Sequence, residues 1–123
     1  MKKKIVLSSV LALGLVGCAT GPQSLYNWGS YPHQTYLMYT APEKATPSAQ
    51  ITTLEAEIQK TKGKGLAVPP GLYAHLGLLY LQENNSQKAI EYFQLERQVY
   101  PESTVLMDRL LQKMNANGGN TKS

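Results

Sequence analysis

The stretch from Pro69 to Ser103 constrains the fold of this chain more than any other part of the sequence. It contains two apolar segments of helical length, separated by the polar turn Glu83–Ser86, whose residue types end one helix and cap the next. Pro101 ends the second segment, because the residue before a proline is disfavoured in the α region. Gly77 and Ala89 are small enough to let two helix backbones approach closely. The pattern predicts an antiparallel helical hairpin, with Ser86 capping its second helix.

The same stretch resembles a tetratricopeptide repeat, a helical hairpin of about 34 residues. With Pro70 aligned to the first position, the residues that match the repeat pattern are Tyr73, Leu76, Gly77, Tyr80, Ala89, Phe93 and Pro101. The resemblance places Gly77 opposite Ala89 and packs the aromatic side chains around that contact. Glu96 departs from the pattern, which prefers alanine there, and we expect an irregular neighbour at this point.

A single hairpin cannot bury its own apolar surface, so neighbouring helices are expected on both sides. Before it, Ser30 can cap a helix that begins near Pro32, and Ser48 opens a second helix that runs to about Lys62. The second helix carries one apolar stripe at i, i+3 and i+7, made by Ile51, Leu54 and Ile58. We expect these two helices to form a second, degenerate hairpin packed against the first.

After the hairpin, residues 104–114 predict a terminal helix that covers the last hydrophobic surface. Its apolar face contains Leu106, Met107, Leu110, Leu111 and Met114. The predicted fold is therefore all-α, with about two tetratricopeptide-like hairpins and a capping helix in residues 25–114. The polar, glycine-containing residues 115–123 are predicted to be a disordered tail.

The N-terminus predicts a secretory signal at residues 1–17. Three lysines precede an apolar run from Ile5 to Val16, which is too short to span a membrane as a folded element. The run leads into Leu15-Val16-Gly17-Cys18, which resembles the lipobox of bacterial lipoproteins. Cys18 is the only cysteine in the chain, so its expected role is acylation and not an internal disulfide. The alternative is a plain secretory signal with an incidental cysteine.

The lipoprotein resemblance also implies a location. Ala19 follows Cys18, whereas aspartate at that place usually retains Gram-negative lipoproteins in the inner membrane. The rule implies a lipid-anchored protein of the outer membrane, facing the periplasm. Several acyl chains, at about 0.8 kcal/mol per buried CH₂, are sufficient for stable anchoring. Residues 18–24 are then the lipidated N-terminus and a tether that reaches at most about 20 Å.

Charge and residue inventory point away from nucleic-acid binding and catalysis. The net charge of +4 falls to +1 without the three lysines of the signal, so no basic surface is indicated. His33 and His75 are the only histidines, and Glu55 and Glu57 are two residues apart and point to different sides of a helix. We predict no enzyme activity, no metal site, no cofactor and no small-molecule substrate.

Two stretches leave alternatives open. Leu25 to Tyr39 contains five aromatic residues, which either pack the first helix onto the repeat, sit at the lipid interface or bind a ligand; packing is favoured. Lys60, Lys62 and Lys64 alternate with threonine and glycine and predict a flexible basic loop. This loop is either solvated, the favoured interpretation, or in contact with anionic lipid phosphates.

The repeat resemblance also implies a groove for a partner. The first helix of such a hairpin lines the concave face, and its residues outside the core are here His75, Leu78 and Gln82, at i, i+3 and i+7. Leu78 is the informative residue, since an apolar side chain on this stripe is covered either by a neighbouring helix of the same chain or by a partner.

A second resemblance covers nearly all of the predicted mature chain. The segments Tyr26 to Tyr31, Pro69 to Gly77 and Tyr100 to Ser103 are similar to those of an uncharacterised family of small proteobacterial lipoproteins. Such proteins are often encoded beside a lipoprotein similar to the curli secretion pore. The resemblance is specific for the family and says almost nothing about mechanism. We expect an assembly or interaction module that uses its helical repeat to dock another envelope protein, namely an outer-membrane lipoprotein. The alternative is a regulatory lipoprotein that activates a periplasmic enzyme such as a peptidoglycan synthase. The short tether favours a partner beside the membrane.

Overall fold

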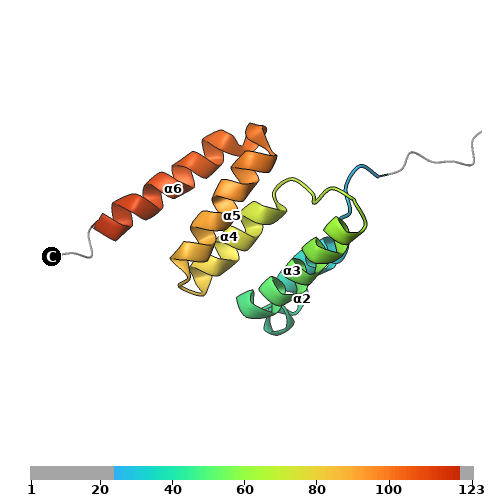
Figure 1. Cartoon of the computed structure of the whole chain (residues 1–123). Helices are drawn as coiled ribbons and strands as arrows, with labels where there is room; N and C mark the ends of the chain where they lie inside the picture. Colours follow the sequence, from blue (N-terminus) through green and yellow to red (C-terminus); the bar gives the residue numbers. More distant parts are fainter. Residues whose placement is uncertain (1–23, 120–123) are drawn as a thin grey trace, which may run out of the picture.

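The computed structural model describes residues 24–119, and all regular elements there are helical (Figure 1). The predicted all-α fold is confirmed. The α-helices α3 to α6 form a row in which each packs on the next along the chain. The predicted signal, the acylation site Cys18 and residues 120–123 lie outside the described part.

The central hairpin consists of α4 (Leu72–Gln82) and α5 (Ser86–Val99). The turn between them contains Asn84 at φ 57°, the left-handed conformation that asparagine tolerates. Asn85, and not Ser86 as predicted, caps α5: its side chain accepts a hydrogen bond from the backbone N–H of Lys88 at 3.1 Å. Asparagine and serine are comparable caps, so the local sequence alone does not choose between adjacent candidates.

The close approach of α4 and α5 depends on Gly77. A Cβ atom added to this buried glycine would lie 2.4 Å from Cε1 of Phe93, whose side chain is fully buried. The atoms nearest to this position belong to the ring of Phe93, and not to Ala89, which the repeat pattern places opposite the glycine. Ala89 is fully buried in the cluster that Phe93 forms with Met107 of the last helix.

On one side of the hairpin, α3 (Pro47–Gly63) packs against α4. The predicted stripe is correct, since Ile51, Leu54 and Ile58 are buried in one cluster with apolar residues of α4. The helix begins one residue before the predicted Ser48, because the side chain of Thr46 accepts a hydrogen bond from the N–H of Ala49 at 3.3 Å.

The helix α2 (Tyr31–Thr40) precedes the short 3₁₀ helix η2 (Pro42–Lys44) and packs mainly against it. The predicted packing of α2 along α3 as a degenerate hairpin is not observed. Gln34 is the only buried residue of α2, and it is polar. The helix therefore has no apolar stripe to pack on α3. Ser30 occupies the N-cap position but its side chain makes no capping hydrogen bond, contrary to the prediction.

On the other side, η3 (Pro101–Ser103) leads into α6 (Thr104–Gly119), which packs on α5. The helix continues past Met114, so the prediction of a disordered tail beginning at residue 115 is wrong for residues 115–119. Met107 is buried, but Leu106 is 58% exposed and does not belong to the packed face as expected. The C-terminal end of α6 lies at the opposite end of the molecule from α2 (Figure 1).

The predicted basic loop is largely helical. Lys60 and Lys62 belong to the last turn of α3, and the Lys62 ammonium lies 5.9 Å from the centroid of the Tyr73 ring, a cation–π contact. The prediction of a flexible loop here is wrong because α3 continues to Gly63. The chain beyond it is held by Asn27, whose backbone N–H donates to the carbonyl of Ala67 at 3.1 Å.

Candidate functional site

The residues that match the repeat pattern come together in the central hairpin. Those fully or almost fully buried are Tyr73, Leu76, Gly77, Ala89 and Phe93. Tyr80 is half-buried, and Pro101 is exposed at the start of η3, directly after the end of α5. The exposed position of Pro101 agrees with a role in ending the helix and not in packing.

The three residues of the predicted groove occupy different environments. His75 is half-buried, its ring meets that of Tyr31 edge to face at 5.5 Å, and its Nε2 lies 3.1 Å from Oε1 of Gln50. Burial lowers the pKa of His75, which favours the neutral imidazole. Leu78 is 42% exposed and Gln82 is exposed. His75 is thus covered within the chain, and the open part of the stripe begins at Leu78.

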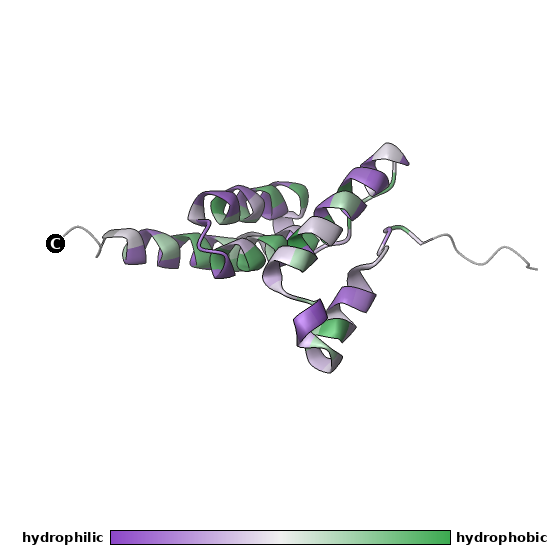
Figure 2. Cartoon of the chain, turned by 90° about the horizontal axis from the view of Figure 1, so that it is seen from below, coloured by the Kyte–Doolittle hydropathy of each residue, from purple (hydrophilic) through white to green (hydrophobic). Residues whose placement is uncertain are grey.

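A hydrophobic cleft lies between the ends of α4, α5 and α6, and Leu81 on its lining follows Leu78 by three residues in α4. Its volume is about 780 Å³. The apolar lining residues are Leu81, Ile90, Leu110 and Met114. Lys113 and asparagine side chains of α6 form its polar part. Figure 2 shows apolar residues in the part of α6 that lies beside the hairpin. Sequence analysis missed this cleft because the continuation of α6 past Met114 was not predicted.

Sequence analysis also missed a polar cluster around Glu55 of α3. The Glu55 carboxylate accepts hydrogen bonds from the hydroxyls of Tyr80 at 2.6 Å and Tyr92 at 2.7 Å. The two rings stack at 5.6 Å, and Tyr73 stacks on Tyr92 at 6.3 Å. Burial, followed by the hydrogen bond to Glu55, raises the pKa of Tyr80 to about 12 and raises that of Tyr92 as well. The cluster joins α3, α4 and α5 and keeps these tyrosines neutral.

We expect Glu55→Gln to destabilise the fold by about 1 kcal/mol, because a neutral acceptor replaces the charged one. The pKa of Tyr80 should also fall toward its ordinary value. In the wild type the raised pKa stabilises the fold fully below about pH 10, and this contribution is lost as the pH rises through about 12. Thermal melts and tyrosinate absorbance across this range test both effects. Glu91→Gln is the control, since Glu91 is exposed on α5 and forms a surface ion pair with Lys88; an equal loss of stability in both variants would contradict the role of Glu55.

Glu96 has a structural role that its departure from the repeat pattern did not reveal. The side chain is fully buried, and its Oε1 accepts hydrogen bonds from the backbone N–H of Gly71 at 2.8 Å and from the Ser103 hydroxyl at 3.1 Å. Gly71 is the N-cap of α4 and has no side chain to supply an acceptor. Glu96 therefore supplies the hydrogen-bond acceptor at the N-terminus of α4 and links it to η3.

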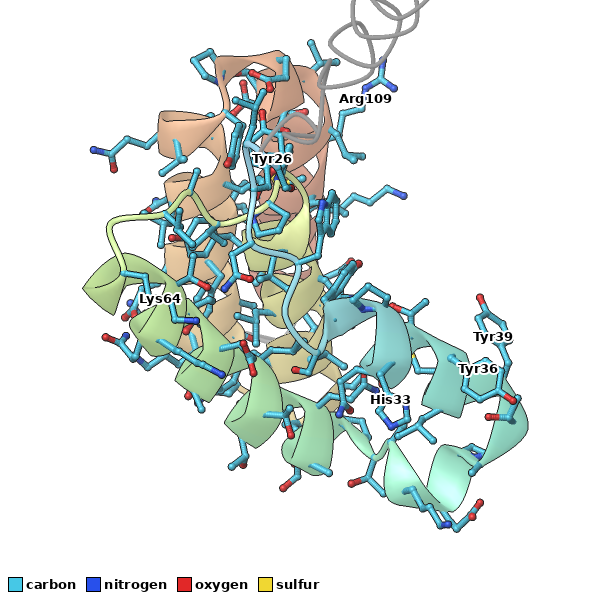
Figure 3. All side chains as sticks on the ribbon, turned by 90° about the vertical axis from the view of Figure 1, so that its right-hand side faces the viewer. Tyr26, His33, Tyr36, Tyr39, Lys64 and Arg109 are labelled. Atoms are coloured by element: carbon cyan, nitrogen blue, oxygen red, sulfur yellow. The ribbon has the colours of Figure 1, made fainter. Side chains whose placement is uncertain are left out.

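The aromatic residues near the N-terminus divide into two groups. Tyr26 contacts Tyr100 edge to face at 6.4 Å, and Trp28 stacks on Tyr31 at 6.1 Å, so this group packs on the helices as favoured from the sequence. Tyr36 and Tyr39 are 61% and 83% exposed and project outward from α2 (Figure 3). Packing therefore accounts for only part of the aromatic segment.

Within residues 24–119, no group of histidine, cysteine, aspartate and glutamate side chains could hold a metal ion. No helix in the same range has the length and apolar character needed to cross a membrane. The surface features of the described chain are thus an apolar cleft at one end and exposed aromatic residues at the other.

Comparison with known proteins gives a family and nothing more specific. No curated protein matches the chain. No solved structure matches it either. A family model described as a domain of unknown function, DUF4810, matches residues 25–110. This range contains α2 to α5 and the first part of α6, and it covers most of the chain. The protein is therefore a member of the DUF4810 family.

Proposed function

We propose that the protein is a lipid-anchored interaction module of the outer membrane that docks another envelope protein in the cleft between α4, α5 and α6. The observation that carries the proposal is this apolar cleft of about 780 Å³, which α4 lines with Leu81, three residues after the exposed Leu78. A monomer rarely leaves such an apolar surface uncovered, and within residues 24–119 only α4, α5 and α6 line it.

The shape and chemistry of the cleft suit an amphipathic helix. It lies between helices, and Leu81, Ile90, Leu110 and Met114 provide apolar contacts for one helix face. Lys113 on the lining offers a positive charge for an acidic residue of the partner. A helix from a neighbouring envelope protein would thus pack against α4, α5 and α6 and cover the cleft.

The anchor determines where such a partner must be. Acylation at Cys18 and the residue Ala19 imply the outer membrane, and the six residues from Ala19 to Ser24 reach at most about 20 Å. The partner is therefore expected close to the membrane, and we propose another outer-membrane lipoprotein.

Leu78→Asp tests the docking site. We expect this variant to lose its partner, because full burial of a leucine side chain contributes roughly 1.5–3 kcal/mol and an aspartate would be desolvated instead. Helicity and melting temperature should stay close to wild type, because the side chain is already 42% exposed. The measurement is purification of the cross-linked, membrane-anchored protein in mild detergent, with identification of the bound protein by mass spectrometry.

Leu66→Asp is the matched control, since Leu66 is 45% exposed and lies in the segment between α3 and α4, whereas Leu78 belongs to α4, one of the helices that line the cleft. It should retain the partner. Undiminished capture by a folded Leu78→Asp variant would move the docking surface elsewhere. Loss of folding in that variant would instead assign Leu78 to the core.

A further inference from the structure

The outer face of α2 exposes two tyrosine side chains, with the imidazole of His33 three residues before the first of them. Tyr36 and Tyr39 on this helix are 61% and 83% exposed, and they project away from the other helices (Figure 3). Leu25, close to the first described residue, is 80% exposed. These side chains make no contribution to the two buried clusters of the fold. Their exposure to water is unfavourable unless another surface covers them.

The segment that contains this face has no charged residue. Between Lys4 and Glu43 the sequence contains no lysine, arginine, aspartate or glutamate. A helix exposed to water normally carries charges on its outer face. Tyrosine and tryptophan, in contrast, are enriched where a bilayer meets water, because one end of each side chain is apolar and the other forms hydrogen bonds. The composition of this face fits a lipid interface.

The position of the segment in the chain fits the same surface. Cys18, the proposed lipid attachment site, is separated from Ser24 by a stretch that spans at most about 20 Å. The α2 helix follows shortly after and is itself about 15 Å long. An anchor at Cys18 therefore keeps this helix near the membrane. The C-terminal end of α6, with the cleft, is at the other end of the molecule (Figure 1).

We propose that α2 lies on the membrane surface, with Tyr36 and Tyr39 at the level of the lipid headgroups. The inference rests on the proposed lipid anchor at Cys18 and adds a second contact, which orients the domain so that the cleft points away from the bilayer. The proposed contact is made by tyrosine side chains and not by lysine or arginine, so high salt should leave it unchanged. A contact made by the lysines of α3 with lipid phosphates would weaken in high salt.

The test uses the single tryptophan of the chain, Trp28, as the starting point. In a Trp28→Phe background, Tyr36→Trp places the only tryptophan on the outer face of α2. Gln112→Trp, in the same background, places it at an exposed position of α6 as the control. Each full-length, acylated protein is reconstituted into phosphatidylethanolamine and phosphatidylglycerol vesicles that contain lipids brominated on their acyl chains. Circular dichroism checks that Trp28→Phe, which removes the stacking on Tyr31, leaves the helices intact.

The tryptophan at position 36 is expected to emit at shorter wavelength and to lose most of its fluorescence to brominated lipid, at low and high salt alike. The tryptophan at position 112 should be unaffected. Flotation with the vesicles but no quenching at position 36 would overturn the interfacial role of α2 and leave the anchor intact; the aromatic face would then belong to a protein partner. Failure to float would contradict the anchor itself and, with it, the inference. Quenching that disappears in high salt would assign the contact to the lysines and also overturn the proposal.

Discussion

Gly77→Leu is expected to lower the free energy of unfolding by about 1–3 kcal/mol, a large fraction of the stability of a small domain. Even the first atom of the new side chain, Cβ, would lie 2.4 Å from Cε1 of Phe93. The ring of Phe93 is fully buried and cannot rotate into open space, so the two helices must separate. Chemical denaturation, followed by circular dichroism, measures the loss.

Gly63→Leu provides the control for this substitution. Gly63 is in α3, and a Cβ there would have no atom within 4 Å. This variant should be as stable as wild type or slightly more stable, because leucine favours the helix over glycine.

The double variant Gly77→Ala with Phe93→Leu should lose less stability than the sum of its single substitutions, because the smaller side chain at position 93 makes room for the methyl group. Unchanged stability of Gly77→Leu would contradict the packing of α4 on α5.

Cys18→Ser is expected to abolish acylation completely and to leave a precursor that retains residues 1–17. In the proposed anchor the diacylglycerol group would be attached through the thiol of Cys18, and the hydroxyl of serine is a far weaker nucleophile. Metabolic labelling with palmitate and mass spectrometry of the N-terminus measure the two effects. Normal maturation and labelling of Cys18→Ser would contradict the proposed anchor.

Ala19→Asp serves as the companion variant. It keeps the cysteine, so processing and labelling should stay at the wild-type level. The aspartate should change only the destination, from the outer to the inner membrane, and separation of the two membranes by density gradient measures this. If Cys18→Ser and Ala19→Asp gave the same processing, the same labelling and the same membrane location, the sequence around Cys18 would not act as a lipoprotein signal.

Much of the fold could be predicted because it depends on local chemistry and on periodicity. The stripe of Ile51, Leu54 and Ile58 and the break at Pro101 both appear in the structure where the sequence placed them. The details that failed were choices between adjacent options of similar energy, such as Asn85 against Ser86 as the cap of α5. The packing of α2 was also mispredicted, since a helix without an apolar stripe carries no information about its neighbour.

Less of the candidate site could be predicted from the sequence. His75, Leu78 and Gln82 share one face of α4, but Tyr31 covers His75, and only the part from Leu78 onward is open. Spacing along one helix defines which residues share a face, and it does not say which of them another element covers.

The sequence by itself determined the helices, their order and the close approach of one pair, because caps, prolines, glycines and apolar periodicity act within a few residues of each other. Only the tertiary structure decided which hydrogen bonds the side chains of Glu55 and Glu96 form. The Glu55 carboxylate accepts hydrogen bonds from tyrosines of two other helices, and Glu96 reaches across the hairpin to the backbone N–H of Gly71, the N-cap of α4. These contacts join residues far apart in the chain, and their strength depends on burial that exists only once the helices have packed.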